Sequence, residues 1–130
     1  AGKRVISTDT AAQLLAMLHA VTGDEGTARK ARVPGYQVGG KTGTVHKVGP
    51  GGYEANKYVA LFVGIAPIDN PRIVSVVVIN DPKGALYGGG AVAAPVFSEI
   101  TSATLRLLNV PPSDMATVRA TAAAAPGGRT

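Results

Sequence analysis

The chain has 130 residues, of which 45% are hydrophobic and 5% aromatic, and it carries a net charge of +5. This composition excludes a disordered chain and allows one modest domain with an aliphatic core. The absence of Cys excludes disulfides, a cysteine nucleophile and thiolate metal sites. The longest apolar run, Val59 to Pro67, is far shorter than the ~20 residues that cross a bilayer. The chain begins with Ala1 rather than Met, which predicts a fragment or a processed product.

The basic residues do not indicate a nucleic-acid partner. Lys and Arg number 13 against 8 Asp and Glu, but only Arg29, Lys30 and Arg32 cluster, and no aromatic residues lie among them. They predict a solvated basic face. No His, Asp and Glu residues stand at metal-ligand spacing, so no metal site is expected. His19 is expected at the edge of an apolar helix and Asp81 in a turn.

The expected elements alternate with clear turn signals. Ser7 is a candidate N-cap for a helix over 8–22, which Gly23 stops. A loop or short helical turn fills 23–34. Strands are expected over 36–48, 58–66 and 72–80, and a helix over 92–109. This order predicts an α+β fold in which helices cover an antiparallel sheet. Residues 1–112 would form the domain, and the Ala-rich residues 113–130 a flexible tail.

The segment Gly35 to Thr44 satisfies two motifs. The first is the phosphate loop G-x-x-x-x-G-K-[ST], met by Gly35, Gly40, Lys41 and Thr42. That motif needs a buried strand before it and a helix starting at the lysine. Here basic residues and a proline precede it, and glycine and β-branched residues follow. A nucleotide-binding domain therefore stays as an alternative, and magnesium-dependent ATP binding would reveal it.

The second motif is Lys41-Thr42-Gly43-Thr44 on an expected strand. It is the third motif of the serine penicillin-recognising enzymes and suits acyl transfer to a D-Ala-D-Ala peptide. Lys41 supplies positive potential, and the hydroxyls of Thr42 and Thr44 can hydrogen-bond a substrate carboxylate. Gly43 leaves space for a ligand along the strand. The backbone N–H of Thr44 is a candidate oxyanion-hole donor.

The surrounding runs EGTARKARVPGYQVGGKTGT, GGYEANKYVALFVGIAPIDNPRIVSVVVINDP and YGGGAVAAPVF resemble class B penicillin-binding proteins. The likeness covers about residues 4–112 and is greatest to the division-specific D,D-transpeptidases of the penicillin-binding protein 3 type. It implies the fold shared with serine β-lactamases, with this chain supplying the last three strands of a five-stranded sheet. The motif strand would lie at the sheet edge, where a peptide can pair with it.

The resemblance also implies that two motifs are missing. Family members carry a Ser-x-x-Lys and a Ser-x-Asn upstream, and no serine of this chain fits either. The nucleophile would come from the missing upstream portion of the same domain, and the chain alone would be inactive. The strand over 72–80 would then present an unpaired apolar edge that favours aggregation.

Three positions depart from the family pattern. Gly39 stands where alanine is common, which would loosen the strand. His46 stands where Arg or Lys is frequent and would contact ligand substituents with less charge. Gly88 replaces a second aromatic residue, so the apolar wall beside the ligand would depend on Tyr87 alone.

The implied protein cross-links septal peptidoglycan at the periplasmic face of the inner membrane, through an anchor upstream of this chain. Its implied partners are peptidoglycan stem peptides, β-lactams and division-machinery proteins, and it needs no cofactor. A non-catalytic interaction module with the same fold and a vestigial site remains the other alternative.

Overall fold

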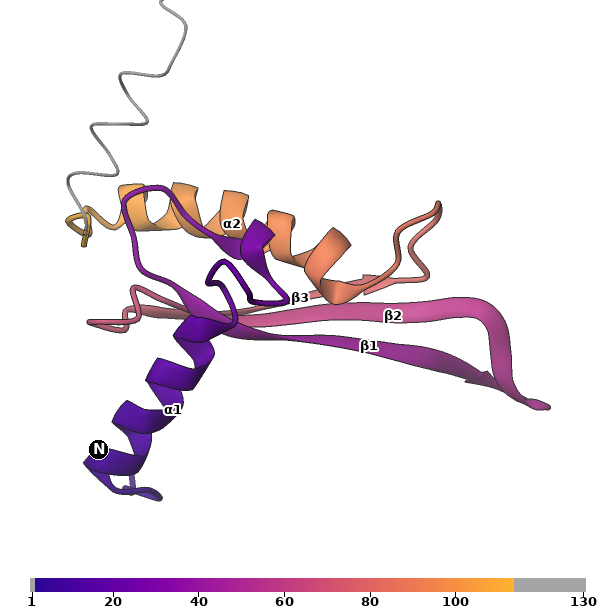
Figure 1. Ribbon diagram of the computed structural model, residues 1–130, viewed down its shortest axis with the longest axis horizontal. Helices are drawn as coiled ribbons and strands as arrows, with labels where there is room; N and C mark the ends of the chain where they lie inside the picture. The colour runs from indigo at the N-terminus through magenta and orange to yellow at the C-terminus, as the bar shows by residue number, and fades with distance from the viewer. Residues whose placement is uncertain (1, 114–130) are drawn as a thin grey trace, which may run out of the picture.

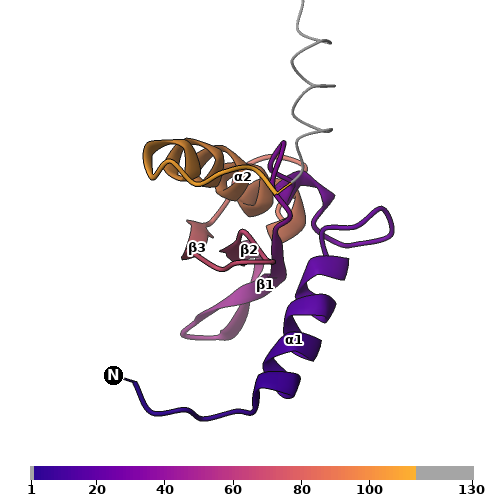
Figure 2. The same ribbon diagram turned by 90° about the vertical axis from the view of Figure 1, so that its left-hand side faces the viewer.

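A computed structural model describes residues 2–113, which form one antiparallel sheet in the order β1-β2-β3 with helices beside it. The strands are β1 (Gly39–Gly49), β2 (Gly52–Ala66) and β3 (Ile73–Asn80). The helices are α1 (Thr8–Ala20), the short 3-10 helix η1 (Arg29–Ala31) and α2 (Gly89–Leu107). Helix α2 lies along one face of the sheet, whereas α1 projects away from the start of β1 (Figures 1 and 2). The expected α+β architecture is confirmed.

Helix α1 begins and ends where its sequence signals predict. The Ser7 side chain accepts a hydrogen bond from the Thr10 backbone N–H at 3.1 Å, as an N-cap does. The helix ends at Ala20, and two further residues turn before Gly23. None of its residues is buried, and Leu14 and Met17 are 45% and 64% exposed. Its apolar stripe is therefore largely uncovered by the described residues.

The core lies between α2 and the sheet. Phe62 of β2 meets Phe97 of α2 edge to face, with ring centroids 4.9 Å apart. Both side chains are fully buried, and Ala93 and Ala94 let the helix approach the strands closely. Burial of these two aromatic rings is the main attachment of α2 to the sheet.

The opposite face of the sheet is apolar and exposed. Residues directly across an antiparallel pair share a face, so Phe62 shares the α2 face with Thr42 and Val77. The other face of β3 carries Val74, Val76 and Val78, each at least 60% exposed. Within residues 2–113 no further strand pairs with β3, which is the unpaired apolar edge predicted above.

Helix α2 begins three residues earlier than predicted, at Gly89. A Cβ on Gly89 would collide with the Leu61 carbonyl oxygen and lie 2.6 Å from that of Gly43. The glycine is therefore required for contact between the helix start and the sheet. Sequence-based prediction counts glycine against a helix, which explains the error at this end.

Strand β2 also begins earlier than expected, at Gly52 instead of residue 58. The predicted tail covers residues 113–130, and all of them except Ser113 lie outside the described part of the chain. Across residues 2–113, every helix is too short or too polar to cross a bilayer.

Candidate functional site

The Lys41–Thr44 motif lies inside β1, which pairs with β2 on one side only. Its strand continues to Gly49 and no helix starts at Lys41. A phosphate loop needs that helix to direct its backbone N–H groups at the phosphate. The nucleotide-binding alternative is therefore wrong.

The pleat of β1 separates the four motif residues onto two faces. Thr42 and Thr44 pair with Phe62 and Ala60, on the face that α2 covers. Lys41 and Gly43 have the opposite orientation. A Cβ on Gly43 would lie 2.7 Å from the Leu61 Cδ1 atom. Glycine at position 43 is thus required by packing inside the sheet.

The motif side chains already have partners. The Thr44 Oγ1 atom accepts a hydrogen bond of 3.1 Å from the Gly89 N–H. The hydroxyls of Thr42 and Thr27 lie 3.4 Å apart. The exposed Lys41 ammonium donates to the Thr42 carbonyl oxygen at 2.9 Å. Because Thr44 Oγ1 acts as acceptor towards Gly89, its own hydroxyl proton remains free for another acceptor.

Thr42 and Thr44 border a groove of about 510 Å³ between β1, η1 and the start of α2. Its other lining residues come from two segments: Gly26, Thr27, Arg29 and Lys30 from one, and Gly88, Gly89, Gly90 and Ala91 from the other. The lining contains two cationic side chains and no carboxylate. Such a groove suits an anionic group of a ligand. The sequence interpretation treated Arg29 and Lys30 as a solvated face, because only the packing of η1 against α2 brings them to the same groove as the motif.

A row of aromatic rings extends the site beyond Thr44. The His46 and Tyr58 ring centroids lie 4.4 Å apart, and Tyr58 stacks on Tyr87 at 4.1 Å with 14° between the planes. Partial burial, with a smaller effect of Tyr87, raises the pKa of the Tyr58 hydroxyl above its ordinary value. Tyr87 is therefore supported by Tyr58, and its expected role in an apolar wall beside the ligand stays a prediction.

The register of the β1–β2 hairpin brings Tyr58 to His46. Gly49 pairs with Gly52 and Val48 with Tyr53, so a regular hairpin would place Ala55 opposite His46. An irregularity between His46 and Val48 shifts the register and brings Tyr58 there instead. A bulge of this kind redirects side chains at the edge of a site.

Acidic residues near the site are few and take part in ion pairs. Asp81 follows β3 with a positive φ of 56° and binds Lys83 at 2.6 Å. That hydrogen bond lowers the pKa of the Asp81 carboxyl, which agrees with its predicted turn role. In the described residues, no three His, Asp or Glu side chains gather as a metal site would require.

Comparison with known proteins assigns the family. Residues 1–102 match the family described as penicillin binding protein transpeptidase domain. The chain is 43% identical over 116 residues to the peptidoglycan D,D-transpeptidase FtsI of Escherichia coli K12, covering 89% of this chain and 20% of that protein. It is 46% identical over 112 residues to stage V sporulation protein D of Bacillus subtilis, covering 86% of this chain and 17% of that protein.

A solved structure gives the same result. The apo transpeptidase domain of Burkholderia pseudomallei penicillin-binding protein 3 matches with a TM-score of 0.79 and 50% identity, over 86% of this chain and 34% of that one. The chain thus spans only about a fifth of the length of FtsI. The resemblance to class B penicillin-binding proteins is confirmed, and the chain belongs to the family of penicillin-binding protein transpeptidase domains.

Proposed function

We propose that this chain supplies one wall of the active site of a peptidoglycan D,D-transpeptidase that cross-links stem peptides during septal cell-wall synthesis. The observation that carries the proposal is the orientation of Thr42 and Thr44 beside a cationic groove free of carboxylates. A hydroxyl-lined, positively charged groove next to an open strand edge fits a peptide that ends in a carboxylate. The relatives named peptidoglycan D,D-transpeptidases support the reaction class.

Each motif residue has a distinct part in the proposed reaction. The hydroxyls of Thr42 and Thr44 bind the terminal D-Ala carboxylate, and Lys41 supplies positive potential from the other face of the strand. The backbone N–H of Thr44 donates to the oxyanion that forms when the penultimate D-Ala carbonyl is attacked. Gly43 keeps the strand close to β2, so that these groups hold their places.

The nucleophile comes from outside this chain. None of its serines is followed by Lys at the third position. A serine from an upstream segment forms an ester with the stem peptide and D-Ala leaves. An amine of a neighbouring stem peptide then takes the acyl group and frees the serine. β-Lactams acylate the same serine.

The upstream segment also completes the fold. It covers the exposed apolar face carried by Val74, Val76 and Val78, and it pairs with the free edge of β3. Exposure of these valine side chains to water is unfavourable, because each Å² of apolar surface removed from water contributes roughly 25 cal/mol to stability. The proposed protein is anchored upstream, acts at the periplasmic face of the inner membrane, and assembles with division-machinery proteins.

The aromatic row shapes ligand preference. His46 and Tyr87 contact the substituents of the bound peptide or β-lactam, with Tyr58 stacked behind Tyr87. His46 supplies less positive charge than Arg or Lys would at this position.

Intact mass spectrometry after benzylpenicillin treatment tests the proposal. The protein that carries this chain together with its upstream segment is expected to gain one penicillin adduct, located on an upstream serine. The 130-residue chain alone is expected to gain none. An adduct on this chain alone would place the nucleophile here, and no adduct on either protein would favour the vestigial module.

Two lysine variants test the motif itself. Lys41→Met should slow acylation by at least about a hundredfold, because it removes charge stabilisation at the reacting centre. Lys47→Met, on the same strand but outside the motif, should change the rate by less than about twofold. Equal rates for the two variants would remove Lys41 from the mechanism.

A further inference from the structure

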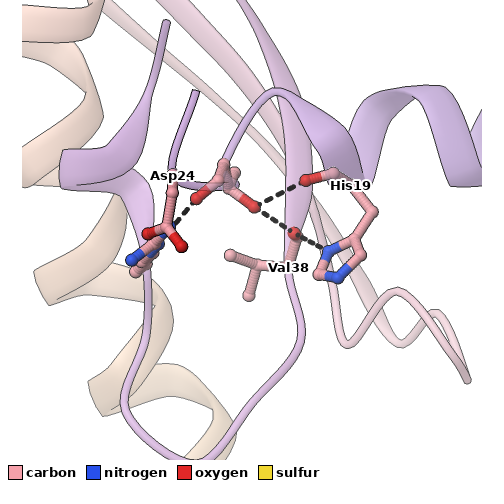
Figure 3. Close-up of polar contacts among 5 residues, drawn as sticks. His19, Asp24 and Val38 are labelled. Atoms are coloured by element: carbon pink, nitrogen blue, oxygen red, sulfur yellow. Dashed lines mark hydrogen bonds and ion pairs between the residues drawn. The ribbon is translucent and has the colours of Figure 1, made fainter. Parts of the chain in front are cut away.

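The backbone carbonyl of Val38 receives two hydrogen bonds from the end of α1. His19 Nδ1 lies 2.9 Å from the Val38 oxygen. The Thr22 Oγ1 atom lies 2.8 Å from the same oxygen and 2.9 Å from the His19 carbonyl oxygen, so its one proton is shared between these two acceptors (Figure 3). A carbonyl oxygen can only accept, so His19 carries a proton on Nδ1. Val38 and Thr22 are only 2% and 3% exposed. The Thr22 side of this contact is thus buried, whereas the His19 ring is exposed.

This contact lies directly before the motif strand. Val38 precedes the first residue of β1 and stands three positions before Lys41. At Gly39, a Cβ would lie 2.9 Å from the His19 backbone nitrogen and 2.8 Å from the Ile68 Cδ1 atom. The expectation that Gly39 loosens the strand is therefore wrong. Glycine at this position lets the backbone of α1 press against the start of β1.

Thr22 is itself held in place. Arg32 donates from Nε to the Thr22 carbonyl at 2.6 Å and from Nη2 to the Asp24 carboxylate at 2.8 Å (Figure 3). On α2, the Ser98 hydroxyl donates to the Arg32 carbonyl oxygen. A continuous series of polar contacts thus joins α2 to Arg32, Thr22 and Val38. Within this series, the Thr22 hydroxyl contacts the carbonyl of Val38, the residue directly before the motif strand.

The two ends of the motif are then fixed by different elements. Thr22 holds the backbone ahead of Lys41, and the Gly89 N–H of α2 holds the Thr44 side chain. Between these points, and among residues 2–113, β1 has strand pairing on one side only. If β1 rotated about its pairing with β2, the backbone N–H of Thr44, the proposed oxyanion donor, would move relative to the nucleophilic serine of the upstream segment.

We propose that Thr22 is a positioning residue for the motif strand, and this inference rests on the proposed transpeptidase function. Its hydroxyl fixes the Val38 carbonyl and thereby the placement of Lys41 to Thr44 against the incoming serine. Small displacements at a reacting centre reduce the rate of the chemical step more than they reduce ligand binding. The side chain acts through the backbone and does not touch the substrate.

The test uses the protein that carries this chain with its upstream segment and measures acylation by benzylpenicillin in a stopped-flow experiment. Thr22→Val keeps the shape and removes the hydroxyl. The first-order acylation rate of the folded protein should fall about tenfold, the equivalent of one hydrogen bond. The dissociation constant of the pre-acylation complex should change less than about threefold. Thr22→Ser, which restores the hydroxyl, should recover most of the rate.

Thr104→Val is the matched control. The Thr104 hydroxyl donates to the Ile100 carbonyl oxygen at 2.8 Å, on α2 and away from the motif. This variant should alter the melting temperature at most, and leave the acylation rate unchanged. Should Thr22→Val not fold, His19→Phe removes the other donor to Val38 from an exposed position and should also slow acylation.

The outcomes separate the two proposals. A wild-type protein that benzylpenicillin does not acylate would overturn the proposed function and the role of Thr22 with it. A wild-type protein that is acylated, with Thr22→Val equally fast, would overturn only the positioning role. A loss of rate shared by Thr22→Val and Thr104→Val, or not recovered in Thr22→Ser, would also overturn it.

Discussion

Replacement of Gly89 by alanine should test the contact between α2 and the motif strand. The added methyl group would collide with the Leu61 carbonyl oxygen and lie 2.6 Å from the Gly43 carbonyl oxygen. Both are backbone atoms of the sheet, so neither can rotate away. The start of α2 must move, and the hydrogen bond of 3.1 Å from the Gly89 N–H to Thr44 Oγ1 lengthens or breaks.

The magnitude follows from two effects. Overpacking of a tight contact costs about 1–3 kcal/mol, and loss of the Thr44 hydrogen bond adds about 1 kcal/mol. Gly89→Ala should therefore lower the free energy of unfolding by roughly 2–4 kcal/mol. Gly88→Ala is the matched control, because a Cβ there meets only Thr44 Oγ1, at 3.8 Å, and the φ of −76° suits alanine. Its cost should stay below about 1 kcal/mol, that of a weaker N-cap.

Urea unfolding followed by circular dichroism, in the protein with its upstream segment, gives the two free energies. Equal values for Gly89→Ala and Gly88→Ala would refute the argument that close approach selects glycine at position 89. Acylation by benzylpenicillin adds a second measurement, since displacement of Thr44 should slow it in Gly89→Ala.

Three further predictions concern the core, an ion pair and the free sheet face. Phe62→Ala should lower the free energy of unfolding by about 3–5 kcal/mol, because the ring is fully buried against Phe97; a loss under about 1 kcal/mol in urea unfolding would contradict this packing. The hydrogen bond from Arg32 lowers the pKa of the Asp24 carboxyl. This ion pair therefore stabilises the folded chain above about pH 4, and the stabilisation is lost as the pH falls through the lowered pKa. An NMR titration should show the Asp24 pKa rising in Arg32→Gln, and an unchanged pKa would exclude the ion pair in solution. The isolated 130-residue chain should self-associate on size-exclusion chromatography, less so in Val76→Lys, whereas a well-behaved wild-type monomer would contradict the exposed face.

The local sequence was sufficient for most elements and for the motif. Apolar residues at helical spacing after Ser7 predict α1, and β-branched runs between turn signals predict β2 and β3. These patterns work because burial on one face imposes a period on the chain. The Lys41–Thr44 motif and its surrounding runs also indicated the family that the comparisons confirm.

Long-range contacts decided the composition of the candidate site. Arg29 and Lys30 belong to it because η1 packs against α2, whose first residues also line the groove, and nothing in their own segment indicates that neighbour. Tyr58 stands opposite His46 only because the strand register shifts near the hairpin. A register depends on the free energy of the whole sheet, so a local pattern cannot specify it.

Patterns along the chain were enough to predict most helices and strands, the family and the Lys41–Thr44 motif. Three features came from the packed fold: Thr42 and Thr44 border a cationic groove, Gly39 and Gly89 allow close approach of backbones, and Thr22 contacts the Val38 carbonyl before the motif strand. The physical reason is that element formation depends on neighbours along the chain. A site depends on groups distant in sequence, whose positions are set when the packed core fixes the elements relative to one another.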